Sequence, residues 1–148
     1  MTPPSRPRLI IADDHLNVAH SLRSLLEPDF DVVDVVGEGT AVVAAVEKHR
    51  PDLLLLDLWL PGRNGLDLLR DLAHRCPEVR VVVLTMHADV VVAVEAMNRG
   101  ARGYLLKDSG YDELKEALGV VMGGAPYLSP RVTGATTATT IFQERGRR

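Results

Sequence analysis

Five polar side chains stand at the ends of apolar runs in this sequence, and their types suit phosphoryl chemistry. The runs are RLIIADD (8–14), PDLLLLD (51–57), VRVVVLT (79–85) and ARGYLLKD (101–108), and the polar residues are Asp13, Asp14, Asp57, Thr85 and Lys107. Burying a carboxylate is costly, so an aspartate directly after four leucines indicates that the charge has a use. A carboxylate can accept a phosphoryl group covalently, which makes Asp57 a candidate nucleophile.

Three carboxylates gathered at one place would repel one another. One like-charge pair at ~4 Å costs roughly 4 kcal/mol at an effective dielectric near 20, so either a pKa rises sharply or a cation binds. Oxygen ligands favour a small hard cation, above all Mg²⁺, which keeps several waters and accepts a phosphate oxygen. The ammonium of Lys107 and the hydroxyl of Thr85 add a positive charge and a hydrogen-bond donor, and both suit a phosphoryl oxygen.

These side chains can meet only if the apolar runs are strands of one sheet. The predicted strands cover 8–14, 31–39, 51–57, 79–85 and 101–108, and the predicted helices cover 16–27, 40–50, 65–76, 88–100 and 111–124. Near-continuous apolar strands are typical of a parallel sheet that is buried on both faces. We therefore expect an α/β fold, a doubly wound five-stranded parallel sheet with five helices. The carboxyl ends of its strands share one rim, where such folds bind ligands.

Two segments carry mixed signals. The valines of residues 88–100 favour a strand, but the length of the segment and the stop at Gly100 favour a helix. From Pro126 the chain becomes rich in Thr, Ala and Gly and shows little apolar periodicity. We predict one domain over residues 1–125 and a linker or tail over residues 126–148, with no output domain after it.

Composition excludes several classes of protein. The chain has 148 residues, 46% of them hydrophobic and 25% charged, and its net charge of −3 gives no broad basic surface for nucleic acid. A single cysteine, Cys76, rules out an internal disulfide and a multi-cysteine zinc site. The N-terminal MTPPSRPR lacks the apolar segment of a secretion signal, and no apolar run approaches the ~18 residues of a membrane span. We expect a cytoplasmic protein that does not contact a membrane.

The motifs IIADDH, LLLLDLWLPGRNG, VVVLT and GYLLKD, in this order and spacing, resemble the receiver domain of bacterial two-component response regulators over about residues 7–125. The resemblance implies the flavodoxin-like strand order 2-1-3-4-5. It also implies that Asp57 takes a phosphoryl group from a phosphohistidine of a sensor histidine kinase, with Mg²⁺ or Mn²⁺ present. The implied metal ligands are Asp13, Asp14, Asp57 and the carbonyl of Trp59.

The same resemblance implies a switch rather than an enzyme with a separate substrate. Thr85 matches the hydroxyl that turns toward the phosphoryl group, and Lys107 matches the lysine that pairs with it. Tyr104 matches the aromatic residue whose rotamer reports the state on an output face. GYLLKDSGYDELKEAL and GGAPYLSP are most similar to the subgroup with a LuxR-type helix-turn-helix output. That subgroup implies control of transcription, a possible homodimer, and DNA contact only through an output domain not found in this chain.

Three other functions compete with this interpretation. A phosphohydrolase of the haloacid dehalogenase type needs a second aspartate two residues after the nucleophile, where this chain has Trp59. A flavin or nucleotide carrier needs a Gly/Ser/Thr-rich loop after the first strand, where this chain has ADDHLN. A receiver-like interaction module that acts without phosphorylation stays open, because Trp59 and Met86 are bulky beside the expected phosphoryl site. With His87, this bulk also predicts an altered phosphoryl lifetime.

Single residues have simpler interpretations too. Asp13 could cap the first helix, and Tyr104 could be a half-buried structural tyrosine. The five histidines show no ligand spacing, so we predict surface or turn positions for them, with His87 alone near the site.

Overall fold

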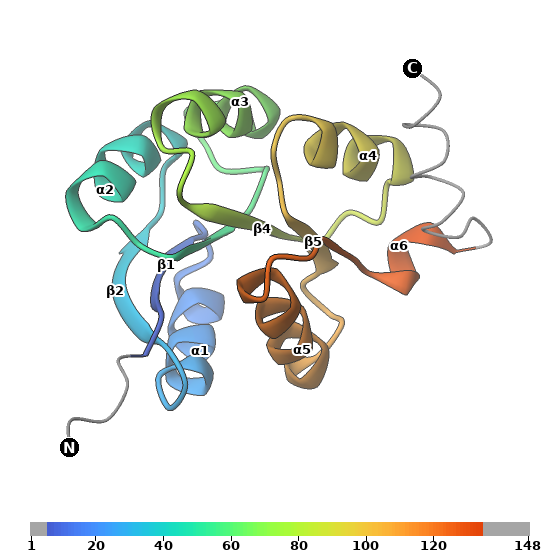
Figure 1. Ribbon diagram of the computed structural model, residues 1–148, viewed down its shortest axis with the longest axis horizontal. Coiled ribbons are helices and arrows are strands. Elements are labelled where there is room, and N and C mark those ends of the chain that lie inside the picture. The colour runs from blue at the N-terminus through green and yellow to red at the C-terminus, as the bar shows by residue number, and fades with distance from the viewer. Residues whose placement is uncertain (1–5, 135–148) are drawn as a thin grey trace.

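Strands and helices alternate along the chain up to residue 134. The computed structural model describes residues 6–134, and its strands form one parallel sheet in the order β2-β1-β3-β4-β5-β6 (Figure 1). The strands are β1 (Arg8–Ala12), β2 (Asp31–Val36), β3 (Leu53–Leu56), β4 (Arg80–Thr85), β5 (Gly103–Leu106) and β6 (Tyr127–Leu128). The helices are α1 (Leu16–Leu26), α2 (Val42–His49), α3 (Gly65–Arg75), α4 (Val90–Asn98), α5 (Tyr111–Met122) and α6 (Pro130–Thr133), and a 3₁₀ turn, η1 (Gly39–Ala41), precedes α2.

The prediction of five strands and five helices is wrong at the C-terminal end of the described residues. The order of the first five strands agrees with the flavodoxin-like prediction, but the sheet has a sixth strand, and a sixth helix follows it. β6 pairs with β5 through Gly103–Tyr127 and Tyr104–Leu128. A two-residue strand and a four-residue helix are too short to show a period, so this segment looked like a linker. Residues 135–148 of the predicted tail lie outside the described residues.

Helices cover both faces of the sheet. In Figure 1, α2, α3 and α4 lie on one face and α1 and α5 on the other. Alternate residues of β3 divide between the two cores: Leu54 and Leu56 pack beneath α2, α3 and α4, while Leu53 and Leu55 pack against α1 and α5. This two-sided burial explains the unbroken run of leucines before Asp57.

The ambiguous valine-rich segment is helical, as predicted. Asp89 caps α4, because its side chain accepts hydrogen bonds from the backbone N–H groups of Val91 and Val92. The helix buries Ala93, Ala96 and Met97 against the sheet. Even α5, at 12 residues, is far shorter than the ~20 residues of a transmembrane helix. Within residues 6–134, no helix is long and apolar enough to cross a bilayer.

Candidate functional site

The carboxyl ends of β1, β3 and β5 bring Asp13, Asp57 and Lys107 together. The sheet ladder continues one residue beyond the strands, since the N–H of Asp57 donates to the Ala12 carbonyl (3.0 Å) and that of Lys107 to the Thr85 carbonyl (2.8 Å). Lys107 Nζ lies 2.7 Å from Asp13 Oδ2 and 2.9 Å from Asp57 Oδ2. The three side chains are only 6%, 3% and 5% exposed, respectively. The backbone therefore presents two buried carboxylates to one buried ammonium.

The charge of Lys107 is held in place by its two acidic partners. Burial by itself would lower the pKa of the ammonium, but the hydrogen bonds with Asp13 and Asp57 outweigh it and raise the pKa above its ordinary value. Lys107 thus stays protonated at neutral pH. It offsets part of the repulsion between the two carboxylates, which would otherwise face each other in a medium of low dielectric.

Asp14 and His15 complete the cluster at its mouth. His15 Nδ1 lies 3.1 Å from Asp13 Oδ1 and 3.3 Å from Asp14 Oδ1. One ligand atom from each of Asp13, Asp14, His15 and Asp57 falls within a group whose members are all within 4.8 Å of one another. The expectation that His87 alone would lie near the site is wrong, because His15 lies there too. The signal was its place directly after the acidic pair, although no second histidine stands at a ligand spacing from it.

This donor set fits a divalent cation. Three carboxylates offer oxygen ligands to a hard cation, and two of them are buried where an uncompensated charge is costly. Asp13, Asp14 and Asp57 are therefore the residues that could hold such an ion.

The loop after β3 supports Asp57 from below. The N–H of Trp59 donates to Asp57 Oδ1 at 3.0 Å. Asn64 caps α3 by accepting hydrogen bonds from Leu66 N and Asp67 N. At Gly65, a Cβ atom would lie 2.3 Å from the carbonyl oxygen of Leu58, so only glycine lets α3 begin this close to the loop.

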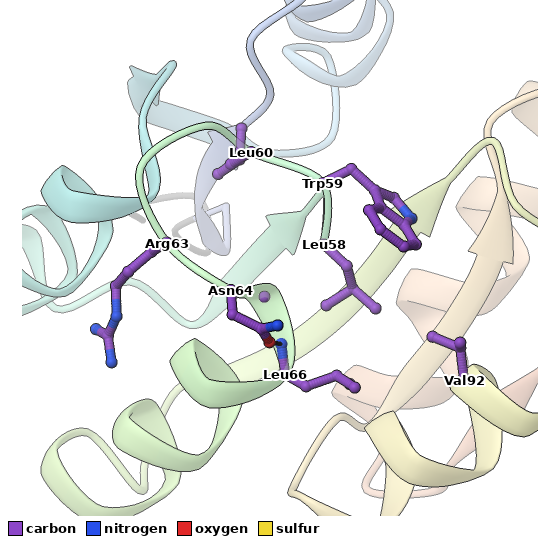
Figure 2. Close-up of a pocket in the computed structure, with 8 residues that line it drawn as sticks. Leu58, Trp59, Leu60, Arg63, Asn64, Leu66 and Val92 are labelled. Atoms are coloured by element: carbon purple, nitrogen blue, oxygen red, sulfur yellow. Dashed lines mark hydrogen bonds between the residues drawn. The ribbon is translucent and has the colours of Figure 1, made fainter.

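A cavity of about 190 Å³ lies beside this loop (Figure 2). Leu58, Leu66 and Val92 line it, and Trp59 stands at its edge. In Figure 2, Arg63 extends away from these apolar side chains. The lining contains none of the three aspartates, so the cavity is separate from the acidic cluster.

Thr85 and Tyr104 are linked through His87. Thr85 is fully buried, and its hydroxyl oxygen accepts a hydrogen bond from the backbone N–H of His87 (3.3 Å). The hydroxyl of Tyr104, also fully buried, donates to the His87 carbonyl (3.1 Å). Burial, helped by the charges of Asp89 and Asp57, raises the pKa of Tyr104 to about 12. One residue, His87, therefore contacts both predicted switch side chains.

Bulky side chains flank the acceptor, as the sequence predicts. Trp59 is 56% exposed, and its ring lies 4.8 Å from that of His87, centroid to centroid, with an angle of 56° between the planes. Met86 is also exposed. Of these residues, Trp59 is held beside Asp57 by the hydrogen bond of its backbone N–H.

One ion pair next to the site lay outside every sequence prediction. Asp108, directly after Lys107, accepts hydrogen bonds from Arg131 Nη1 at its backbone oxygen (2.9 Å) and at Oδ1 (3.2 Å). Arg131 belongs to α6, within the segment predicted to be a linker. No sequence signal could join two residues 23 positions apart without knowing that β6 returns the chain to β5.

Comparisons with known proteins agree on one family. Residues 9–119 match the model of the response regulator receiver domain. The chain is 40% identical over 128 residues to the transcriptional regulatory protein DegU of Brevibacillus brevis, covering 85% of this chain and 54% of that protein. It is 36% identical over 133 residues to the DNA-binding transcriptional activator DevR/DosR of Mycobacterium tuberculosis, covering 88% of this chain and 61% of that protein. It therefore spans little more than half the length of these relatives.

Solved structures give the same result. A LuxR-family two-component response regulator from Aurantimonas sp. SI85-9A1 superposes with a TM-score of 0.83 at 30% identity, covering 96% of this chain and 99% of that one. The isolated receiver domain of RcsB from Salmonella enterica serovar Typhimurium, determined with the phosphomimetic BeF₃⁻, gives a TM-score of 0.82 at 25% identity, covering 90% and 100%. The predicted likeness to the LuxR-type subgroup is confirmed.

Proposed function

This chain belongs to the response regulator receiver domain family, and from that premise we propose that it is a phosphorylation-dependent signalling switch with Asp57 as the acceptor. One observation carries the proposal: Asp57 is a buried carboxylate whose two oxygens face the Lys107 ammonium and the Trp59 N–H, beside two further acids. A sensor histidine kinase is the proposed donor.

In the transfer step, a carboxylate oxygen of Asp57 attacks phosphorus. The P–N bond of the phosphohistidine breaks, its electron pair stays on the ring nitrogen, the imidazole takes up a proton from solvent, and an acyl phosphate forms on Asp57. A cation held by Asp13, Asp14 and Asp57 would neutralise developing negative charge when bound. The ammonium of Lys107, already 2.9 Å from Asp57 Oδ2, pairs with an oxygen of the new phosphoryl group.

The switch step passes through His87. Thr85 turns to donate a hydrogen bond from its hydroxyl to the phosphoryl group. This rotation changes the hydrogen bond that the Thr85 oxygen accepts from the backbone N–H of His87. The His87 carbonyl holds the hydroxyl of Tyr104, so a shift of this residue reaches the centre of β5. The chain in this way carries the state of Asp57 to the surface formed by α4, β5 and α5.

The output is proposed to be control of transcription in a longer regulator. The relatives DegU and DevR/DosR are transcriptional regulators by name, and RcsB has been solved as dimers bound to DNA. For this chain, homodimerisation and DNA contact through an output domain remain part of the proposal. Its catalysis would be limited to its own phosphoryl transfer and dephosphorylation.

A module that acts without phosphorylation is the second candidate. The observation in its favour is the Trp59 ring, which lies tilted against that of His87 and belongs to the residue whose backbone N–H is bonded to Asp57.

Intact mass after incubation with Mg²⁺ and acetyl phosphate separates the two candidates. We expect a single phosphoryl adduct on the wild type that requires Mg²⁺, no adduct on Asp57→Asn, and an unchanged adduct on the matched variant Asp112→Asn, whose acid is exposed on α5. A folded wild type that acquires no adduct from acetyl phosphate or from a sensor kinase would refute phosphorylation and favour the second candidate.

A further inference from the structure

The ring of His15 faces the acidic cluster although the fold makes no use of it as a helix cap. His15 occupies the N-cap position of α1, yet its side chain makes no capping hydrogen bond. Its backbone N–H is held instead by Asp13 Oδ1 at 2.8 Å, which fixes the residue over the site. The side chain is 61% exposed, so a solvated ion can reach the ring directly.

His15 Nδ1 is within hydrogen-bond distance of Asp13 Oδ1, and the distances around Nδ1 also match those between neighbouring ligands of one ion. Metal–ligand bonds of ~2.1 Å at right angles place two ligand atoms roughly 3.0 Å apart. His15 Nδ1 lies 3.1 Å from Asp13 Oδ1 and 3.3 Å from Asp14 Oδ1. A metal shared with these acids therefore requires little movement of the ring.

A positive group already lies among these atoms. Lys107 Nζ is 2.7 Å from Asp13 Oδ2, 2.9 Å from Asp57 Oδ2 and 3.4 Å from His15 Nδ1. The imidazole of His15 and the carboxylates of Asp13 and Asp57 thus surround one positively charged group.

We propose that His15 is a metal ligand and that it gives the site a preference for transition-metal ions over Mg²⁺. Imidazole nitrogen suits Co²⁺, Ni²⁺ and Zn²⁺, whereas Mg²⁺ takes oxygen ligands and keeps its waters. The proposal rests on the proposed function, because the same acids hold the cation used in phosphorylation. It adds that the identity of the available cation regulates this receiver.

The test is equilibrium metal binding without a phosphodonor. Trp59 is the single tryptophan, and its backbone N–H donates a hydrogen bond to Asp57 Oδ1. The fluorescence of its indole therefore reports on the site. Untagged wild type, His15→Asn and the control His20→Asn, an exposed histidine on α1, are titrated with CoCl₂ and with MgCl₂. We expect His15→Asn to lose Co²⁺ affinity by about tenfold or more, the usual loss when a group that supports a metal is removed, with Mg²⁺ affinity little changed.

His15→Gln is the second variant, since it returns an oxygen donor to the same place. It should bind Mg²⁺ and show the same reduced preference for Co²⁺. Equal changes for both ions in both variants, or no change for either ion, would overturn the proposal. Because the titration contains no phosphodonor, it can fail while Asp57 is still phosphorylated in Mg²⁺. Conversely, a wild type that cannot be phosphorylated can still show the His15-dependent preference.

Discussion

Lys107 and Asp108 are consecutive residues at the end of β5, and both form ion pairs, but in opposite surroundings. The side chain of Lys107 is 6% exposed and contacts two buried carboxylates. The side chain of Asp108 is 62% exposed and contacts the half-exposed Arg131 of α6. The N···O distances in the two pairs are similar, so the pairs differ mainly in their exposure to solvent.

The difference teaches where charge matters in this fold. Removing one partner of a buried pair leaves an uncompensated charge in a medium of low dielectric, which is strongly destabilising. An exposed pair is screened by water and salt and contributes about 0–1 kcal/mol. The rim site should therefore dominate both stability and chemistry, while the Asp108–Arg131 pair only helps to fix the position of α6.

Lys107→Met is expected to have the largest effect. It keeps the aliphatic stem but leaves Asp13 and Asp57 facing each other, so we expect the free energy of unfolding to fall by about 3–5 kcal/mol in EDTA. Urea denaturation at neutral pH measures it. Added Mg²⁺ should restore part of the loss, because a cation again separates the acids.

The matched control is Lys115→Met, which removes the exposed pair with Asp29. We expect little change in the free energy of unfolding there, because the pair is screened by water and salt. If the two lysine variants lost similar amounts, burial would not be what separates the two kinds of pair.

Tyr104→Phe tests an intermediate case on the same strand, a group that is fully buried but uncharged. The substitution leaves the His87 carbonyl without its donor, and we expect a loss of about 1 kcal/mol in thermal or urea unfolding. A loss as large as that of Lys107→Met would show that burial alone, without charge, determines how much free energy of unfolding is lost.

Tyr104 also gives a prediction for pH. Its pKa is raised from 10.0 to about 12, so the folded state favours the neutral phenol. The corresponding stability is fully present below pH 10 and is lost as pH rises through about 12. Burial also raises the pKa of Tyr127 to about 12, so ultraviolet titration should find two tyrosines near pH 12 in the wild type and one in Tyr104→Phe. A Tyr104→Phe variant that keeps both would contradict the burial effect on Tyr104.

Arg131→Ala should have the smallest effect. We expect a loss of about 0.2–1 kcal/mol that shrinks further in high salt, as for other exposed pairs. Arg75→Ala, which breaks the exposed pair with Glu47, is the control. A loss above about 2 kcal/mol for Arg131→Ala alone would mean that the Asp108–Arg131 ion pair contributes as much to stability as a buried pair does.

The sequence predicts the rim better than it predicts the end of the sheet. Asp57 directly follows a buried strand, and the apolar run predicts that strand from the sequence. The parallel topology then places the residue after the strand at the carboxyl edge of the sheet. β6 spans two residues and α6 four, and neither can display a period. The contacts of α6 depend on the pairing of β6 with β5, and the local sequence pattern does not predict that pairing.

His15 was missed for a different reason. Its neighbours in sequence, Asp13 and Asp14, are predicted ligands, but the five histidines show no ligand spacing among themselves. The contact arises because the backbone turns into α1 at this residue, which brings Nδ1 back over the acids. A turn of this kind is set by backbone angles rather than by residue types.

The two-residue strand β6 also decides how the sheet meets other proteins. An uncovered edge strand offers a row of free N–H and C=O groups to any passing chain, and natural proteins protect edges with short strands, charge or proline. The outer strand β2 carries Asp31 and Asp34, and β6 is brief and is closed by Pro130. Between them, β5 is buried along its whole length. A protein cut after residue 125 would bare the apolar edge of β5, and we expect self-association through that edge to lower its solubility.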